Sequence, residues 1–425
     1  MTTSSNLIEH KKIHDISPAR KLGIGITEIV IALLIFFVFA LNTANDLTTR
    51  FVMTPGGINQ GTMRDLVFPS RLTLIILAVI TLAIGIYQLI RGFGKQTNLM
   101  VGVSGLFLML AFLVWQAAGT SVNLAGMLSS AVLLAVPITL AAFSGILAER
   151  SGIVNIAIDG MMLMASMTAA IAGSLTKNIW IGMLGGIASA VLLGLLLGVL
   201  SIKYKVNQTI SGTVINIFSA GMTGFISQKF LQTIPRLNQP VMFSRVPIPL
   251  LADIPLIGPI LFNQNIFVYL MFIILIVLQV ALFQTRWGLR FRSVGEHPKA
   301  ADTLGIDVIK TRYMGVMLSG LVAGIAGAFF TLGSVGRFDE GMTAGKGFIG
   351  LAAMIFGNWM PLGSLGAGLL FGFADSIGSK LSLLRSLIPP QFMAMAPYLI
   401  TMIVLAGFIG KGQAPAAEGE PYEKE

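Results

Sequence analysis

The sequence predicts an all-α polytopic membrane protein with about twelve transmembrane helices. Of its 425 residues, 55% are hydrophobic and only 11% are charged, whereas a soluble globular domain carries about 25% charged residues. The mean hydropathy of +0.85 points the same way. A chain with so little charge cannot cover its outside with charged side chains, so most of its surface must face lipid.

Apolar runs long enough to cross a bilayer recur along the whole chain. A transmembrane helix needs about 20 mostly apolar residues. The runs that meet this length lie near 23–41, 72–90, 98–117, 124–147, 153–174, 179–201, 266–285, 312–333 and 393–410. The segment 206–227 is more polar but is flanked like a span, and 347–382 is long enough to cross twice with a turn at 358–363.

Basic residues indicate the orientation of these spans, because Lys and Arg accumulate in cytoplasmic loops. The first 22 residues are polar and basic, and no small-residue cleavage site follows, so we expect an uncleaved first span and a cytoplasmic N-terminus. Counting spans then puts the basic segments 91–97, 202–205 and 286–311 and the C-terminus inside; only the 42–71 loop, with three arginines, disagrees. The net charge of +10 thus reflects topology. No basic run is interleaved with aromatic residues, so we expect no nucleic-acid partner.

The side chains available exclude most membrane enzymes. The chain has no cysteine, which rules out thiolate metal sites and cysteine nucleophiles. Its three histidines, His10, His14 and His297, lie outside the predicted spans, so the GVSG segment at 102–105 has no base for serine chemistry. The segment 340–347, EGMTAGKG, lacks the leading Gly and trailing Ser/Thr of a phosphate-binding loop. We therefore expect no enzyme activity, no metal and no cofactor in this chain.

Two acidic residues, Asp159 and Asp375, fall inside predicted spans. An acidic side chain at mid-membrane costs about 2.5–3.5 kcal/mol on insertion scales, so each needs an explanation. Three explanations remain open: a hydrogen-bonded structural role, a polar substrate path that includes proton-coupled transport, and an aspartyl protease pair.

The polar stretch 292–312, RSVGEHPKAADTLGIDVIKTR, lies between two runs with hardly any charge. Gly295 and Gly305 bracket a short segment that starts at Pro298, and proline suits the first helical position as glycine suits the stop. We expect the small apolar side chains to share one side of this helix: Ala300, Ala301 and Leu304. A two-turn helix is not stable alone, so it must dock onto something at the cytoplasmic face.

The loop 228–265 contains six prolines and falls on the extracellular side. Because proline lacks the N–H that helices and sheets use, we expect a stiff extracellular cap without regular strands or long helices. Elsewhere glycines recur at four-residue spacing, which favours close helix packing in lipid: Gly182/Gly186, Gly194/Gly198, Gly320/Gly324 and Gly368/Gly372.

Three segments carry a family resemblance: FRSVGEHPKAADTLGIDV at 291–308, ILAERSGIVNIAIDGMMLM at 146–164 and GFIGLAAMIFGNWMPLGSLGAGLLFGFADSI at 347–377. Together they resemble the permease subunits of bacterial ABC importers, in the branch for ribose-type sugars, nucleosides and branched-chain amino acids, closest to nucleoside or simple-sugar permeases. The first segment is similar to the cytoplasmic coupling loop of that branch. The resemblance covers about 98–410.

The resemblance implies a ten-helix core like that of type II importers such as the vitamin B12 importer, with two extra N-terminal spans. It implies three parts: 1–97 with the extra spans, the permease core 98–410 with its coupling loop 286–311, and an acidic tail 411–425 that we expect to be disordered. The implied partners are an ABC ATPase subunit, a second permease (a paralogous chain, otherwise a second copy) and an extracellular substrate-binding lipoprotein. The implied location is the bacterial cell membrane.

In such a permease the short cytoplasmic helix would pass the motion of the ATPase to the spans. The residues expected to carry this coupling are Arg292, Gly295, Glu296, Pro298, Lys299, Ala300, Ala301, Leu304 and Gly305. Glu296 and Lys299 would form ion pairs with the ATPase, and Ala300 and Leu304 would fill its groove.

Polar side chains within spans are the candidates for the substrate path, because polar groups and interrupted helices line the paths of transporters. They are Asn155, Asp159, Asn207, Ser211, Asn216, Asn358 and Asp375. No Lys or Arg within the predicted spans offers itself to a carboxylate, which favours uncharged nucleosides or sugars. A permease for branched-chain amino acids and a proton-coupled secondary transporter remain the alternatives.

Overall fold

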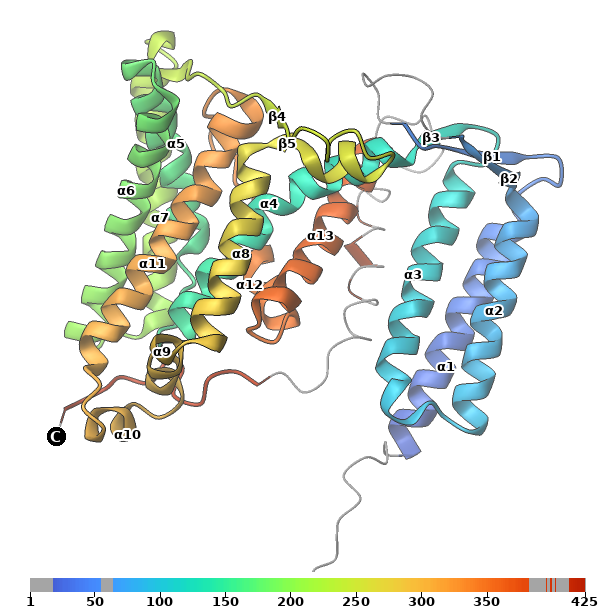
Figure 1. Cartoon of the computed structure of the whole chain (residues 1–425), viewed down its shortest axis with the longest axis horizontal. Coiled ribbons are helices and arrows are strands. Elements are labelled where there is room, and N and C mark those ends of the chain that lie inside the picture. The colour runs from blue at the N-terminus through green and yellow to red at the C-terminus, as the bar shows by residue number, and fades with distance from the viewer. Residues whose placement is uncertain are drawn as a thin grey trace, which may run out of the picture. The chain divides into compact units, whose positions relative to one another are not determined.

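A computed structural model shows an almost wholly helical chain (Figure 1). The structure describes residues 18–54, 64–381 and 413–424, together with Met395, Tyr398, Leu399 and Met402. Its contacts divide the chain into two compact units. Unit 1 comprises the described residues of Met1–Phe51, Asp65–Val122 and Leu399–Gly410, and unit 2 those of Val52–Arg64, Asn123–Tyr398 and Lys411–Glu425.

Unit 1 is built from three long helices. They are α1 (Pro18–Leu34, extended by the π-helical turn η1, Ile35–Ala40), α2 (Ser70–Ile90) and, after the short turn η2 (Gly94–Gln96), α3 (Thr97–Gln116). Lys21 Nζ donates to the Ile90 carbonyl at 3.0 Å, and Arg20 Nη2 donates to Asn98 Oδ1 at 3.1 Å. The start of α1, the end of α2 and the start of α3 therefore share one end. We expected two helices before a boundary at 97, but α3 packs with α1 and α2 and belongs to the same unit.

Short strands join the opposite ends of these helices: β1 (Thr48–Val52), β2 (Leu66–Pro69) and β3 (Ser121–Asn123), in the sheet order β2-β1-β3. The sequence did not predict them. Two arginines of the 42–71 loop have partners here, because Arg50 pairs with Asp65 and Arg71 donates to Asn45 Oδ1 at 2.7 Å. These contacts account for basic residues in a loop where the orientation rule did not expect them.

Unit 2 holds ten helices among the residues described. Five are long: α4 (Leu124–Glu149), α5 (Ile158–Thr176), α6 (Ile179–Gly198, continued by η3, Val199–Lys203), α7 (Gln208–Ile226, continued by η4, Ser227–Leu231) and α8 (Ile266–Gln284). Two short ones follow, α9 (Arg286–Glu296) and α10 (Pro298–Thr303). The last three are α11 (Val308–Ala328, continued by η7, Phe329–Val335), α12 (Lys346–Phe356) and α13 (Pro361–Leu381).

The centre of unit 2 is α4, in which 89% of the residues of an apolar 18-residue stretch are buried and which packs against α11, α12 and α13. Glycines allow its neighbours to approach closely. A Cβ on Gly320 of α11 would lie 2.7 Å from the Ala190 carbonyl of α6, and one on Gly372 of α13 would lie 2.5 Å from the Ala131 carbonyl of α4. Such distances are too short for any side chain, so the predicted role of the four-residue glycine spacings in helix packing is confirmed at these positions.

Nine helices in the described part of the chain are long and apolar enough to span a membrane, which confirms the predicted class. The segment predicted to cross twice forms α12 and α13 with the turn between them. With 11 residues α12 is only about 16 Å long, half the thickness of a bilayer core. The last expected span, 393–410, falls outside the described residues apart from Met395, Tyr398, Leu399 and Met402.

The proline-rich loop after α7 forms short irregular turns, η5 (Pro235–Asn238) and η6 (Gly258–Phe262), as expected. It also contains two three-residue strands, β4 (Arg245–Pro247) and β5 (Asn263–Asn265), which pair antiparallel, so the expectation of no strand is wrong here. Pro247 can close this ladder because it is the last residue of an exposed strand.

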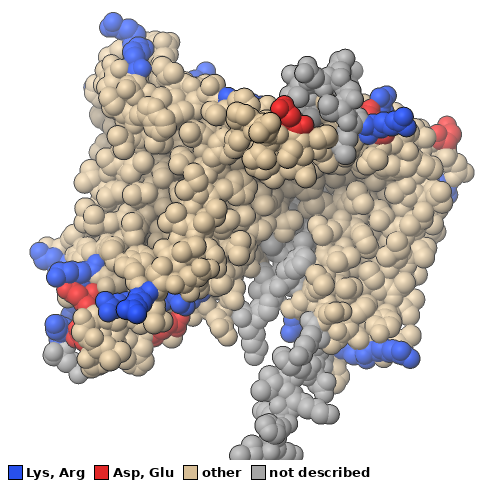
Figure 2. Space-filling model, viewed as in Figure 1, with Lys and Arg blue, Asp and Glu red and all other residues tan. Residues whose placement is uncertain are grey.

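Charged side chains gather at the ends of the helices in each unit, and the visible face between the ends is almost free of them (Figure 2). In unit 2 one end carries α9 and α10, and we call it the α10 end. We expected the chain after 410 to be disordered. Residues 413–424 instead lie along this end, because their backbone groups find hydrogen-bond partners on its loops (Figure 1).

Candidate functional site

The helix α10 is capped at both of its ends. Pro298 occupies its first turn, and the preceding His297 accepts a hydrogen bond at Nδ1 from the Ala300 N–H at 3.2 Å. Beyond the helix, Gly305 has a φ of +80°, which glycine adopts without strain. The prediction of a short helix starting at Pro298 and stopping before Gly305 is confirmed.

The two sides of α10 have different surroundings. Ala301 is 2% exposed and packs in a cluster with Val294 and Val308. Leu304 is 81% exposed, and Ala300 is exposed as well. We expected these three apolar residues on one side, but Ala301 turns into the unit because the helix is only six residues long and needs an anchor. The outer side thus presents apolar side chains that the described chain does not cover.

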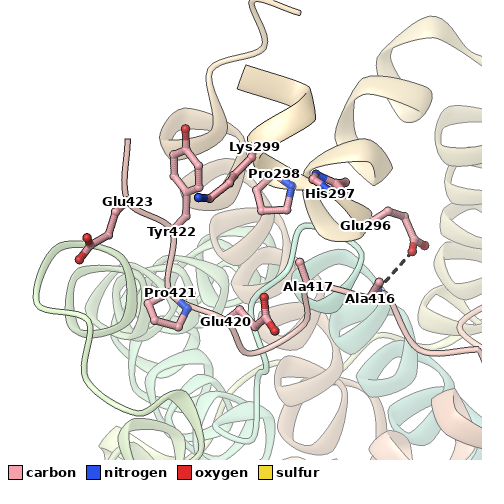
Figure 3. Close-up of a pocket in the computed structure, with 10 residues that line it drawn as sticks. All are labelled: Glu296, His297, Pro298, Lys299, Ala416, Ala417, Glu420, Pro421, Tyr422 and Glu423. Atoms are coloured by element: carbon pink, nitrogen blue, oxygen red, sulfur yellow. Dashed lines mark hydrogen bonds between the residues drawn. The ribbon is translucent and has the colours of Figure 1, made fainter. Parts of the chain in front are cut away.

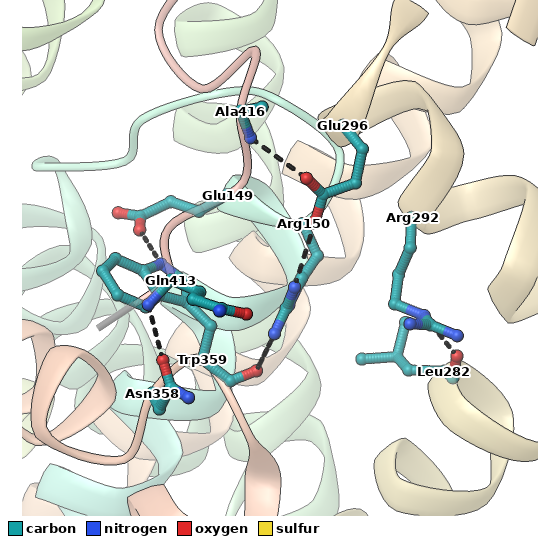
Figure 4. Close-up of polar contacts among 9 residues, drawn as sticks. All are labelled: Glu149, Arg150, Leu282, Arg292, Glu296, Asn358, Trp359, Gln413 and Ala416. Atoms are coloured by element: carbon teal, nitrogen blue, oxygen red, sulfur yellow. Dashed lines mark hydrogen bonds and ion pairs between the residues drawn. The ribbon is translucent and has the colours of Figure 1, made fainter. Parts of the chain in front are cut away.

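The end of α9, directly before α10, lies against the loop between α4 and α5 (Figure 4). A Cβ on Gly295 would lie 2.4 Å from the Arg150 carbonyl oxygen, so only glycine fits. Arg150 pairs with Glu296 at 3.5 Å and donates to the Trp359 carbonyl at 3.2 and 3.3 Å. Burial lowers the pKa of the Arg150 guanidinium, and the charge of Glu296 partly offsets this. Glu296 therefore has a partner within this chain.

The turn between α12 and α13 joins the same network. Asn358 and Trp359 have φ values of +56° and +51°, and Trp359 Nε1 donates to Glu149 Oε2 at 2.5 Å. Asn358 Oδ1 accepts from the Gln413 N–H at 2.8 Å. We expected Asn358 in the substrate path, but the structure puts it at the α10 end, where it binds the residues after 412 (Figure 4).

Arg292 holds α9 against the end of α8. Its Nε donates to the Leu282 carbonyl at 2.9 Å, and its guanidinium lies 4.7 Å from the centre of the Phe283 ring. This fixes the bend between the two helices. Lys299 is exposed on α10 and lines a cavity that α10 shares with residues 416–423. The coupling residues named from the sequence are thus all within one small region, but Arg292, Gly295 and Ala301 face inward.

A second group of polar side chains surrounds the N-terminus of α12. Asp159 Oδ1 accepts from the Gly347 N–H at 2.9 Å, and its Oδ2 accepts from Thr343 Oγ1 at 3.2 Å. Lys346 forms an ion pair with Asp375. Asp375 is 14 residues along α13, about 21 Å from its start at the α10 end. The pair thus lies between the two ends of the unit, where the sequence predicted no lysine.

The other predicted path residues lie on α7 or on the segment before α5. Asn155 is buried and donates to Ser319 Oγ at 2.8 Å. Asn216 accepts from the Gly160 N–H at 2.7 Å and donates to the Ile156 carbonyl at 2.8 Å. These bonds hold 153–157 in a non-helical conformation, so the predicted span 153–174 begins as a helix only at Ile158.

Asn207 and Ser211 occupy the first turn of α7. Asn207 is exposed and caps the helix by accepting from the Ile210 N–H at 3.1 Å. Ser211 is buried, and its hydroxyl has no partner among the residues described. Of the predicted path residues, the structure brings together Asp159 and Asp375 around α12, and Asn155 and Asn216 before and beside α5.

Sequence reasoning missed Glu149, Arg150 and Trp359 as functional candidates. All three stand inside the segments that carry the family resemblance. Glu149 and Arg150 also form a charged pair where a long apolar helix ends. A charged pair at a helix end beside a tryptophan-containing turn was a visible signal, but nothing in the sequence indicated that the two segments meet.

Comparisons with known proteins agree with the family resemblance that these segments carry. Residues 127–406 match the family described as the permease component of branched-chain amino acid transport systems. The chain is 41% identical over 300 residues to the guanosine ABC transporter permease protein NupQ of Bacillus subtilis, covering 68% of this chain and 94% of NupQ. It is 39% identical to the nucleoside ABC transporter permease protein NupC of Lactococcus lactis, covering 68% and 93%. It is 30% identical to the putative glucose ABC transporter permease protein TsgC13 of Haloferax volcanii, covering 71% and 98%. No solved structure matches the chain.

Proposed function

Since the chain belongs to the family of permease components of branched-chain amino acid transport systems, we propose that it is the nucleoside-translocating permease subunit of an ABC importer. It is a multi-pass membrane protein and a transport component rather than an enzyme. The following paragraphs derive how its residues would serve that function.

The observation that carries the proposal is the outer side of α10. A six-residue helix has too few hydrogen bonds to be stable on its own, yet this one is capped at both ends, anchored by Ala301 and presents Leu304 at 81% exposure. A rigid projection with an uncovered apolar side chain is suited to the groove of a partner. We assign that groove to the ATPase subunit and the α10 end to the cytoplasm, in agreement with its basic residues.

The network around Arg150 provides a path from α10 into the helices. Arg150 bonds to Glu296 next to α10 and to Trp359 at the turn between α12 and α13. Gly295 is in such close contact with the Arg150 carbonyl that one cannot move toward the other without a clash. A displacement of α10 by the ATPase would therefore move the end of α4 and the start of α13 with it.

The region around the N-terminus of α12 is our candidate for the substrate path. Two helices, α5 and α12, begin between the ends of the unit, and interrupted helices of this kind form the sites of many transporters. Lys346 is paired with Asp375, so it does not offer a free charge to a substrate carboxylate. This favours an uncharged polar substrate, and the named activities of NupQ and NupC favour guanosine and other nucleosides over sugars and branched-chain amino acids.

Proton-coupled secondary transport is the alternative that Asp159 and Asp375 suggested. Both carboxylates already have strong donors: Asp159 has the Gly347 N–H and Thr343, and Asp375 has Lys346. A carboxylate held by a cation or an amide does not need to take up a proton to be accommodated. The same pairing with Lys346 disfavours a protease dyad, in which two carboxylates share one proton.

A complete importer on this proposal contains an ABC ATPase, a second permease and an extracellular substrate-binding lipoprotein. We propose a paralogous chain as the second permease, with the substrate path between the two. The proline-rich loop after α7, at the end opposite α10, would receive the binding protein.

The test is uptake of radiolabelled guanosine into cells or proteoliposomes that contain the complete complex, with competition by nucleosides, pentoses and branched-chain amino acids. We expect competition by nucleosides, dependence on ATP and no loss on collapse of the proton gradient. Uptake that survives ATP depletion but stops with the proton gradient would favour the secondary transporter. Competition by leucine or valine alone would identify an amino acid permease.

A further inference from the structure

Residues 413–424, which we call the tail, cross the α10 end and are fastened to several of its loops. The Ala417 N–H donates to the Gly295 carbonyl at 2.9 Å, and the Gly419 N–H donates to the Gly152 carbonyl at 3.2 Å. The further contacts are Gln413 with Asn358, Ala416 with Glu296, Glu423 with Lys205 and Lys424 with Asp302. The tail thus touches the loops that end α4, α6, α9, α10 and α12.

The tail also covers a cation. Arg312, on α11, is 2% exposed, and its Nη1 donates to the Glu420 carbonyl at 2.8 Å. Its Nε and Nη2 have no partner among the described residues. A buried guanidinium is costly to leave unpaired, so the carbonyl that the tail supplies stabilises the interior of this end. The tail is therefore an integral part of the unit.

One side chain of the tail joins the core that anchors α10. Tyr422 packs, partly buried, against the cluster of Val294, Ala301 and Val308. The side of α10 that faces inward is therefore shared between α9, α11 and the tail. The tail therefore packs directly against α10.

Between the tail and the start of α10 lies a cavity of about 540 Å³ (Figure 3). Its wall carries three carboxylates, Glu296, Glu420 and Glu423, against one ammonium group, that of Lys299. Glu296 and Glu423 are already paired with Arg150 and Lys205. The carboxylate of Glu420 makes no direct hydrogen bond or ion pair among the described residues, although its charge interacts with that of the Arg312 guanidinium, and its side chain points toward the cavity in Figure 3.

We propose that the tail is the second half of the docking surface for the ATPase subunit, and that the cavity receives a positively charged side chain of that subunit at Glu420. This rests on the proposed function, because it takes α10 to be the coupling helix. The cavity is lined by Pro298 and Lys299 at the start of α10, and the outer side of the same helix presents Ala300, so one partner surface can cover that side and place a cation against Glu420. A cavity wall with more carboxylates than ammonium groups, next to an uncovered apolar surface, has the complementarity that a cationic side chain of the partner requires.

The test compares ATPase retention and ATP-dependent guanosine uptake between variants of the full complex. Affinity-tagged permease is purified with its ATPase subunit, and the ratio of the two chains is measured. We expect Glu420→Lys to lower both retention and uptake on the order of tenfold or more, the effect of placing like charges across an interface. Glu420→Gln should have a smaller effect in the same direction. A chain that ends at Gly412 should lose the ATPase as well.

Two controls separate docking from folding. Asp46→Lys makes a matched change from an acidic to a basic side chain at an exposed position of unit 1, and it should leave retention and uptake unchanged. A monodisperse elution profile of Glu420→Lys shows that the variant is folded, which the shortened chain alone would not establish.

Three outcomes would overturn the inference. Equal retention and uptake in the wild type, Glu420→Lys and the shortened chain would show that the tail does not take part in docking. Increased uptake in the shortened chain would make the tail an inhibitory segment instead. Failure of the wild-type chain itself to retain an ATPase would remove the proposed function, and the inference with it.

Discussion

The contact at Gly295 allows a sharp test of the α10 end. A Cβ at this position would lie 2.4 Å from the Arg150 carbonyl oxygen, 2.9 Å from its carbon and 3.2 Å from the Gly152 nitrogen. All three are backbone atoms, which cannot rotate away. An ordinary contact begins near 3.4 Å, so Gly295→Ala forces α9 and the α4–α5 loop apart by about 1 Å.

We expect two measurable consequences of Gly295→Ala. Overpacking of this kind costs about 1–3 kcal/mol, so the purified protein should lose thermal stability. The shift also separates the Gly295 carbonyl from the Ala417 N–H and Arg150 from Glu296. Uptake should therefore fall further than stability alone explains, with substrate-stimulated ATP hydrolysis reduced in parallel.

Matched glycines supply the controls. Gly305→Ala introduces a methyl group with no atom within 4 Å but at a φ of +80°, so it should cost about 1 kcal/mol through the backbone alone. Gly23→Ala in α1 meets nothing and should be neutral or slightly stabilising. A Gly295→Ala protein as stable and as active as the wild type would show that this contact has room for a methyl group, which would refute the prediction.

Three further predictions concern single groups. Leu304→Ser should leave thermal stability unchanged, because the side chain is 81% exposed, but should lower retention of the ATPase in copurification; unchanged retention would remove Leu304 from the docking surface. Asp375→Asn should destabilise the folded protein by about 3 kcal/mol, because it leaves the charge of Lys346 without its partner. Adding Lys346→Met to the same chain should restore part of that stability in a thermal-shift assay. A double variant as unstable as Asp375→Asn would contradict the pairing. Burial raises the pKa of Glu418, while its hydrogen bond to Glu149 and the charge of Arg150 partly offset this. A carboxyl group with a raised pKa stabilises the folded state less as pH rises above its ordinary range. The protection of residues 413–424 against hydrogen exchange, taken relative to the intrinsic exchange rate at each pH, should therefore fall with rising pH, and in Glu418→Gln this fall should be smaller.

Much of the fold was predictable because each element has a local cause. The long apolar runs become helices since lipid leaves no other way to satisfy the backbone, and α10 follows from Pro298 and Gly305. The beginning of α5 was placed five residues early. Hydropathy does not report the hydrogen bonds by which Asn155 and Asn216 hold the preceding residues in a non-helical conformation.

The sites were harder to predict because they depend on contacts between distant segments. Asp375 was recognised as a polar residue within a span, but its partner Lys346 stands 29 positions earlier, in a segment that looked like a loop. Asn358 was assigned to the substrate path, whereas its bond to Gln413 belongs to the α10 end. The residues after 412 are polar and rich in Glu, a composition typical of disorder. Their order comes from the loops that bind their backbone, which composition does not describe.

The position of these residues also fixes when the permease can be completed during synthesis. A chain is made from its N-terminus, so residues 413–424 leave the ribosome after every helix described in unit 2. Until then Arg312 lacks the Glu420 carbonyl, and the cluster of Val294, Ala301 and Val308 lacks Tyr422. A nascent chain would thus present an unfinished surface at the α10 end. On the docking proposed above, assembly with an ATPase would begin only after residues 413–424 have been made, which would keep incomplete permeases out of finished transporters.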